Sequence, residues 1–160
     1  MQHDTNPFAA DDADRHAIWE MLVRKDIDGF AAADWAIFSG GFKHDGFAGL
    51  DAKGSLDPAD WALRFPTVEA YRDAWLADAR RARETAYAEP LRDALFRATD
   101  MRDIRVAGDT ATARKTFDDA IALADGGSQR LNWQSVFFCT KEAGAWKITG
   151  FVGFLPFAGK

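Results

Sequence analysis

Apolar residues near the start of the chain recur at helical spacing. Four residues, separated by four, three and four positions, share one face: Trp19, Val23, Asp26 and Phe30. This period predicts one helix from about 12 to 32. Asp34 can cap a short helix that follows, and Thr67 can cap a long helix of about 68–86. The polar residues 1–10 predict a flexible N-terminal arm.

The last third of the chain changes from helical spacing to alternation. Between Leu95 and Leu155 apolar and polar residues mostly alternate, and turn signals separate the runs. Four strands are expected, at about 95–107, 110–119, 130–140 and 145–155. Residues 42–51 are expected to form an irregular strand, and 61–65 a short one. Helices followed by a meander of long strands indicate an α+β fold with an antiparallel sheet.

Composition fits one globular domain and narrows the function classes. Six Trp and thirteen Phe among 160 residues can build a sizeable core or line a cavity. The net charge is −5, and acids dilute the nearest basic cluster, at 80–83, so nucleic-acid binding is not expected. No apolar run approaches the ~20 residues of a membrane span. The acidic start is unlike a signal peptide, so a cytoplasmic protein is expected. The single cysteine, Cys139, excludes an intrachain disulfide.

Four short motifs follow the predicted order of elements. They are Asp34-Trp35, Phe42-Lys43-His44-Asp45-Gly46-Phe47-Ala48-Gly49, Gly108-Asp109-Thr110-Ala111-Thr112-Ala113 and Gly144-Ala145-Trp146-Lys147-Ile148. In this order they resemble the nuclear transport factor 2 superfamily, most closely its polyketide-cyclase (SnoaL-like) branch, over about residues 12–156. The resemblance implies a single domain, 11–160, whose curved antiparallel sheet wraps around the N-terminal and central helices as a cone. The open end of such a cone usually holds a pocket.

The same resemblance leaves the function open. The superfamily includes steroid isomerases, scytalone dehydratases, epoxide hydrolases, polyketide cyclases and proteins without catalysis, so the fold does not determine the reaction. Asp26 is similar in position to a catalytic tyrosine on the first helix of the steroid isomerases. Their catalytic base falls on Leu50, next to Asp51. Both departures argue against steroid isomerisation.

Asp26 is the most informative single residue, because a carboxylate on an apolar helix face costs several kcal/mol unless it is paired or open to water. It either faces a pocket as a catalytic acid or base, or pairs structurally with a cation such as Lys115 or Arg102. Lys115 shares strand parity with the apolar Ala113 and Phe117, which predicts an interior cation. The alternative is that Lys115 and Arg102 extend to the sheet edge.

Further candidates complete the predicted pocket. Arg102 shares parity with Ile104, and Gln134 with Val136, so both are expected to bind the ligand. An aromatic rim is expected from three tryptophans: Trp35, Trp61 and Trp75.

His44 is the third catalytic candidate, as a general acid or base with a near-neutral pKa. A solvent-exposed loop histidine is the alternative. His16 and Glu20 have metal-ligand spacing but no third ligand, so no metal is expected. No cofactor-binding or nucleophile signature is present, and no cofactor is expected.

These patterns favour a cofactor-independent lyase, isomerase or cyclase acting on a small hydrophobic or aromatic molecule. Asp26 or His44 would act as the base, and Lys115 or Arg102 would stabilise negative charge. The alternative is a non-catalytic module of the same fold that binds a ligand or dimerises. A homodimer is expected because strand 145–155 is apolar on both faces, with Phe151 and Leu155 placed opposite Trp146, Ile148 and Val152.

Overall fold

The structure, a computed structural model, describes residues 3–158. The chain begins with one long helix made of α1 (Ala13–Trp19), a π-helical turn η1 (Glu20–Arg24) and α2 (Lys25–Ala32). The predicted helix of 12–32 is confirmed. Ala33 adopts a left-handed conformation that ends it. Asp34 then caps α3 (Trp35–Ser39) by accepting a hydrogen bond from the backbone N–H of Ala36.

Two further helices lie between the early strands and the meander. Thr67 caps α4 (Val68–Glu84), as its position predicts. A short 3₁₀ turn, η2 (Pro58–Asp60), precedes the second strand. The helix α5 (Leu91–Ala98) occupies residues 95–98, where the sequence predicted the start of a strand. That expectation is wrong because Ala94 and Ala98 recur at helical spacing and pack together against the sheet.

The sheet has six strands in the order β2-β1-β6-β5-β4-β3. Their bounds are β1 (Ala48–Asp51), β2 (Ala62–Phe65), β3 (Thr99–Ala107), β4 (Thr110–Ala122), β5 (Ser128–Glu142) and β6 (Ala145–Leu155). The four-strand meander is antiparallel as expected, but β1 pairs with β6 in parallel. A Cβ on Gly150 would lie 2.5 Å from the carbonyl oxygen of Ala48, so this close pairing requires glycine.

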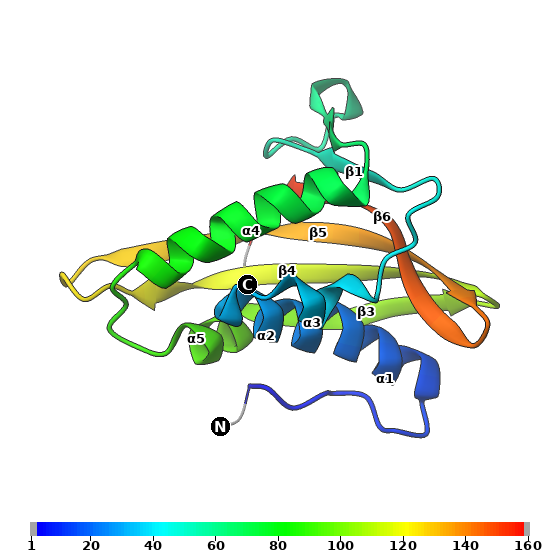
Figure 1. Cartoon of the computed structure of the whole chain (residues 1–160), viewed down its shortest axis with the longest axis horizontal. Helices are drawn as coiled ribbons and strands as arrows, with labels where there is room; N and C mark the ends of the chain where they lie inside the picture. The colour runs from blue at the N-terminus through cyan, green and yellow to red at the C-terminus, as the bar shows by residue number, and fades with distance from the viewer. Residues whose placement is uncertain (1–2, 159–160) are drawn as a thin grey trace.

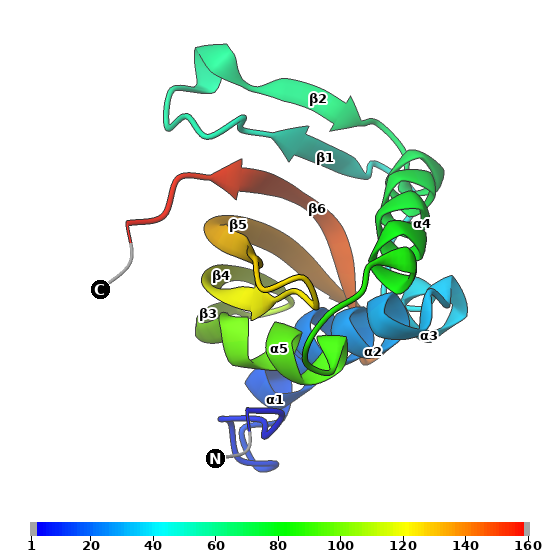
Figure 2. The ribbon, with the colours of Figure 1, turned by 90° about the vertical axis from the view of Figure 1, so that its left-hand side faces the viewer.

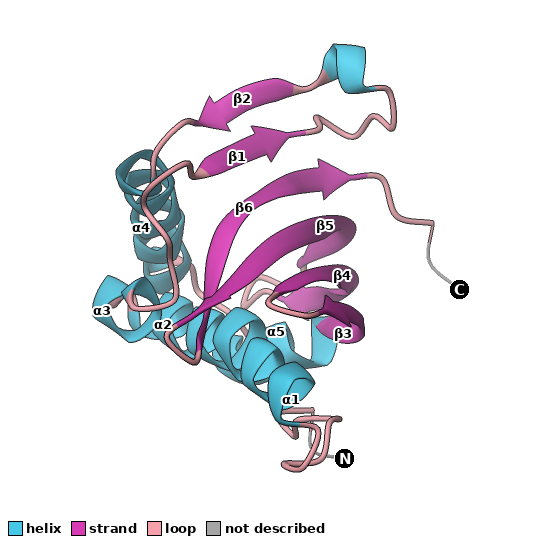
Figure 3. Cartoon of the chain, turned by 90° about the vertical axis from the view of Figure 1, so that its right-hand side faces the viewer, coloured by secondary structure: helices cyan, strands magenta, loops and turns pink. Residues whose placement is uncertain are grey.

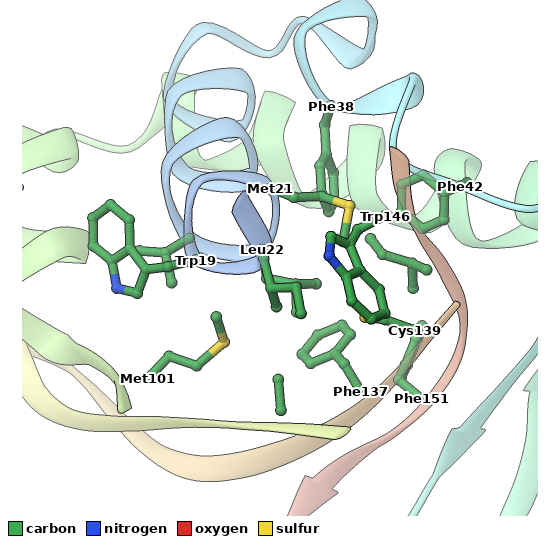
Figure 4. Packing of buried hydrophobic residues seen from close by; sticks show 14 of the residues in the cluster. Trp19, Met21, Leu22, Phe38, Phe42, Met101, Phe137, Cys139, Trp146 and Phe151 are labelled. Carbon is green, nitrogen blue, oxygen red and sulfur yellow. The ribbon is translucent and has the colours of Figure 1, made fainter. Parts of the chain in front are cut away.

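The sheet curls around the helices, as the predicted cone fold requires. Figure 1 shows α4 and the long N-terminal helix lying across the strands, and Figure 2 shows the curvature of the sheet from one end. Figure 3 gives the opposite view, with β1 and β2 extending the sheet beyond β6. The main core fills the space between the N-terminal helix and the concave face, where Leu22, Met101 and Phe137 pack together (Figure 4).

The faces of β6 differ from the predicted alternation. Its register shifts opposite the Phe138–Cys139 step of β5, which leaves one extra residue in β6. Phe151 therefore lies in the main core together with Trp146 and Ile148. Val152 and Leu155 face the other side of the sheet, in a small cluster with Trp61. The same chain thus covers part of the outer face that was expected to need a second subunit.

The predicted N-terminal arm is described from residue 3 onward, and residues 1–2 lie outside the described part. The side-chain amide of Asn6 donates to the carbonyl oxygen of His16 at 3.0 Å. Arg24 donates to the carbonyl oxygen of Asp4 at 2.6 Å. Phe8 packs against the main core. These contacts hold residues 3–10 along the first helix. Among residues 3–158, no helix combines the length and the apolar character needed to cross a membrane.

Candidate functional site

A cavity of about 820 Å³ lies between the helices and the concave face of the sheet. The walls come from α2, α4, α5 and the strands β2, β4, β5 and β6. Most of the lining is aromatic or aliphatic, and its aromatic members include Phe65, Phe117, Trp133, Phe137 and Phe151. Its polar members include Asp26, Tyr71, Lys115 and Ser135, and the charged residues Arg64, Asp78 and Arg81 also line it. Cavities of this size and composition are typical of small-molecule sites.

Lys115 projects into this space from β4. The alternation of that strand turns Ala111, Ala113 and Lys115 inward, and the Lys115 side chain is 1% exposed. Its Nζ donates to Asp26 Oδ2 at 2.7 Å and to the carbonyl oxygen of Leu22 at 2.6 Å. Leu22 lies in the π-helical turn η1, a rare element that often occurs at functional sites. The expected interior cation is therefore present and paired.

Asp26 receives two donors from different elements. Besides Lys115, the indole Nε1 of Trp75 donates to Asp26 Oδ1 at 2.8 Å. Trp75 reaches Asp26 from α4 because position 29 of the first helix is glycine: a Cβ there would lie 3.2 Å from Trp75 Cη2. The Asp26 side chain is 19% exposed. The carboxylate is thus oriented by fixed donors while still bordering the cavity.

Tyr71 and Ser135 also line the cavity, and neither was predicted as a site residue. Tyr71 lies one turn before Trp75 on α4. Burial raises the pKa of Tyr71 well above its usual value, and the charges of Asp26 and Asp78 raise it further, so the phenol stays protonated. Ser135 pairs directly with Lys115 across β5 and β4. The spacing of Tyr71 from Trp75, and the register of β5 on β4, are the signals that identify them.

Only one of the three predicted rim tryptophans lines the cavity. Trp75 does, as described above. Trp35 lies behind it, with the two ring centroids 5.1 Å apart, and stacks on Phe42. Trp61 packs on the outer face of the sheet, where its Nε1 donates to the carbonyl oxygen of Ser55 at 2.9 Å. The rim predicted from Trp35 and Trp61 is therefore wrong, because each tryptophan is enclosed in a cluster away from the cavity.

Three more predicted site residues lie outside the cavity. His44 is 61% exposed, and its Nδ1 lies 3.2 Å from Glu69 Oε1. Arg102 is 74% exposed beside Asp100, because a bulge between Asp100 and Asp103 turns Met101 inward in its place. Gln134 lies on the outer face and donates to the carbonyl oxygen of Pro156 at 2.9 Å. In β5 the odd-numbered positions face inward: Leu131, Trp133, Ser135 and Phe137.

Within residues 3–158, no three His, Cys, Asp or Glu side chains come together as metal ligands. Of the eight predicted site residues, the structure joins Asp26, Lys115 and Trp75 in one hydrogen-bonded group. The other five are separated from it.

No protein-family model matches the sequence, and neither does the sequence of any curated protein. Solved structures do resemble this fold. A nuclear transport factor 2-like protein of unknown function from Shewanella baltica OS155 is 16% identical over 92% of this chain and 96% of its own, with a TM-score of 0.54. Two further structures that resemble this fold are nuclear transport factor 2-like proteins of unknown function from Pseudomonas putida KT2440 and Methylobacillus flagellatus KT. Both are 16% identical, with TM-scores of 0.55 and 0.53.

The Pseudomonas putida alignment covers 87% of this chain and 84% of the other, and the Methylobacillus flagellatus alignment covers 96% and 98%. These comparisons extend over nearly the whole chain. This protein therefore has the nuclear transport factor 2-like fold. The polyketide-cyclase branch stays a prediction from the sequence motifs.

Proposed function

We propose that the cavity binds a small, largely apolar organic molecule that carries one polar group. The observation that supports this most directly is the position of the Asp26–Lys115 pair at the wall of an 820 Å³ cavity. A pair that served stability alone could be replaced by packed apolar side chains at little cost. Here the pair borders open space instead of filling it.

The polar end of such a ligand would meet both donors and acceptors. An ammonium group has three protons, and Lys115 uses two of them on Leu22 and Asp26. Each carboxylate oxygen of Asp26 accepts one hydrogen bond and can accept a second. Tyr71 adds a neutral phenol on the same cavity wall. A carbonyl or hydroxyl group of the ligand suits this set.

The apolar body of the ligand would lie against the aromatic wall. Phe117 and Trp133 stack with ring centroids 4.6 Å apart, and Phe137 and Phe151 lie 5.5 Å apart. Planar rings pack well on such surfaces, in offset or edge-to-face contact. This lining favours an aromatic or polycyclic body over a sugar or a nucleotide.

Cofactor-independent proton transfer is the second candidate function. Asp26 and the protonated Tyr71 line the same cavity, which provides a base and a hydrogen-bond donor together. Asp26 would remove a proton from carbon next to a carbonyl group. Tyr71 or Lys115 would stabilise the enolate oxygen by hydrogen bonding, and Asp26 would return the proton to a different carbon. The hydrogen bonds from Lys115 and Trp75 hold the Asp26 carboxylate in place at the cavity wall.

Binding can be tested with the neutral fluorescent probe N-phenyl-1-naphthylamine. The expected result is saturable enhancement of its fluorescence by the folded protein. Ala74→Phe places a ring inside the cavity and should abolish the enhancement, because Ala74 is part of the lining. Ala145→Phe makes the same exchange at an exposed position at the start of β6, outside the cavity lining, and serves as the matched control. Equal binding by wild type and Ala74→Phe would refute a site in this cavity.

The proton-transfer candidate needs a separate readout. Enolisable aromatic ketones incubated in deuterium oxide should exchange protons for deuterium faster with wild type than with Asp26→Asn, provided that both proteins bind the probe. If wild type binds these ketones but each exchanges only at the uncatalysed rate, the proton-transfer function is refuted and ligand binding alone is left.

We also propose that the protein forms a homodimer through the outer face of the sheet. Phe138 is 43% exposed there, beside a shallow depression of about 460 Å³ that Thr112 and Thr149 also line. A large apolar side chain in a depression of a sheet face is typical of contact surfaces. A two-fold axis would place the same patch of each copy against the other.

A further inference from the structure

A second depression adjoins the cavity at the rim formed by the ends of β2, β5 and β6. It measures about 430 Å³, and Asp51, Lys53 and Asn132 line its far side. Three residues line both spaces: Arg64, Trp133 and Phe154. A ligand that fills the cavity and extends past its rim would therefore enter this depression.

Arg64 is held at that rim with most of its hydrogen-bonding capacity unused. Its guanidinium carbon lies 4.8 Å from the centroid of the Phe65 ring, which is a cation–π contact. Its Nη1 lies 3.5 Å from Asp51 Oδ2. A guanidinium group has five N–H donors in a fixed fork that matches a carboxylate. The side chain is 49% exposed, so an incoming anion can reach it.

The charges around this rim favour an anion, although the whole protein carries −5. Inside the cavity Lys115 is neutralised by Asp26, and elsewhere on the lining Arg81 is paired with Asp78. The adjoining depression has two cations, Lys53 and Arg64, and one acid, Asp51. One oxygen of Asp51 already accepts the backbone N–H of Lys53 at 2.9 Å. This leaves one positive charge in excess at the rim.

An aromatic surface connects this rim to the cavity. Trp133 lies between Phe117 and Phe154, with ring centroids 4.6 Å and 5.5 Å away. Phe154 has a φ of 57°, a left-handed conformation that bulky residues rarely adopt. Such conformations concentrate at binding sites, where the surrounding structure maintains them. A planar ring can lie along this surface while a group attached to it reaches Arg64.

We propose that Arg64, assisted by Lys53, binds an acidic group on the cavity's ligand, so that the ligand is an aromatic acid. This inference rests on the proposed function, because it assumes that the cavity holds the aromatic body. The acidic group, a carboxylate in the simplest case, accepts two parallel hydrogen bonds from the Arg64 fork. The neutral interior and the positive rim then select for a molecule with an apolar body and one anionic end.

Two matched probes separate the two proposals. N-phenyl-1-naphthylamine and 8-anilinonaphthalene-1-sulfonate share one ring system, and only the second carries an anionic group. The expected result is tighter binding of the sulfonate by wild type. Arg64→Gln should weaken sulfonate binding roughly tenfold, as expected for a charge-assisted bidentate contact, and change binding of the neutral probe less than about twofold. Lys53→Gln should produce a smaller loss in the same direction.

Arg72→Gln is the matched control, because it removes a cation that is paired with Asp73 and lines neither the cavity nor the adjoining depression. It should leave both affinities unchanged. Equal weakening by Arg72→Gln and Arg64→Gln would point to general surface charge and overturn the subsite. Unchanged sulfonate binding in both Arg64→Gln and Lys53→Gln would overturn it as well. Failure of wild type to bind either probe would instead refute the proposed function.

Discussion

Replacing Asp26 by Asn leaves a buried ammonium group without its opposite charge. The substitution preserves the shape of the side chain, so it tests charge and not packing. Lys115 is 1% exposed and keeps only the carbonyl oxygen of Leu22, at 2.6 Å, as a strong acceptor. The Asn side chain has one oxygen for two donors, Lys115 and Trp75, so one of these donors loses its partner.

Breaking a buried ion pair by removing one partner costs about 3–5 kcal/mol. We expect the lower end, about 3 kcal/mol, because the Phe117 ring lies 5.4 Å from Nζ and retains part of the stabilisation. For a domain of this length, each kcal/mol lowers the melting temperature by about 2–4 °C. Asp26→Asn should therefore melt roughly 6–12 °C below wild type.

Replacing Lys115 should lower the free energy of unfolding less than replacing Asp26. Lys115→Met leaves Asp26 with the Trp75 donor, and the carboxylate is 19% exposed to the cavity. We expect a loss of about 1–3 kcal/mol, the cost of one lost charge-assisted hydrogen bond. The double variant should be more stable than Asp26→Asn alone, because it contains no unpaired buried charge.

Urea unfolding of the four proteins, monitored by tryptophan fluorescence and by circular dichroism, measures these differences. Binding of N-phenyl-1-naphthylamine by each variant reports whether the cavity remains intact. The reasoning would be refuted if Asp26→Asn lost less than about 1 kcal/mol, or if adding Lys115→Met lowered its stability further.

Three further predictions concern the rest of the molecule. Burial raises the pKa of the Cys139 thiol to about 12, so Ellman's reagent at pH 8 should react only with the unfolded protein. Because the folded pKa exceeds the unfolded one, stability should fall as pH rises from about 9 to 12, and less so in Cys139→Ala. Arg97 lowers the pKa of Glu89 and, after the backbone N–H of Ala120, that of Asp119. This stabilisation is present at neutral pH and is lost as pH falls below about 4, so Arg97→Gln should lower the urea midpoint at pH 7 more than at pH 2; an equal loss at both would contradict it. Light scattering at micromolar concentration should find a dimer, and Phe138→Asp a monomer; a monomeric wild type would exclude the proposed interface.

The Asp26–Lys115 pair shows how far local patterns can reach. Helical period placed Asp26 on an apolar face, and strand alternation did the same for Lys115. Neither charge is tolerated alone in such a setting, so their pairing could be predicted from the cost of an unpaired buried charge. The helices at 12–32 and 68–86 and the meander followed from the same two periods.

The misplaced residues share a different cause. Strand alternation has two possible phases, and a single extra residue exchanges them. The bulge between Asp100 and Asp103 moved Arg102 outward. In β5 the run Val136-Phe137-Phe138-Cys139 is apolar in both phases, so the sequence did not reveal that Ser135 faces inward and Gln134 outward.

The sequence by itself determined the α+β class and the order of most elements, because these depend on periodic patterns within single segments. For Asp26 it left two interior partners open, Lys115 and Arg102, and the structure selected the Asp26–Lys115 pair. The tertiary structure alone decided which groups share the cavity with that pair. Tyr71 reaches it through the packing of α4. Gly29 admits Trp75 to Asp26, and the ends of three strands bring Arg64 beside Trp133 and Phe154. These contacts join residues distant in the chain, and their geometry depends on register and helix packing, which local periodicity does not specify.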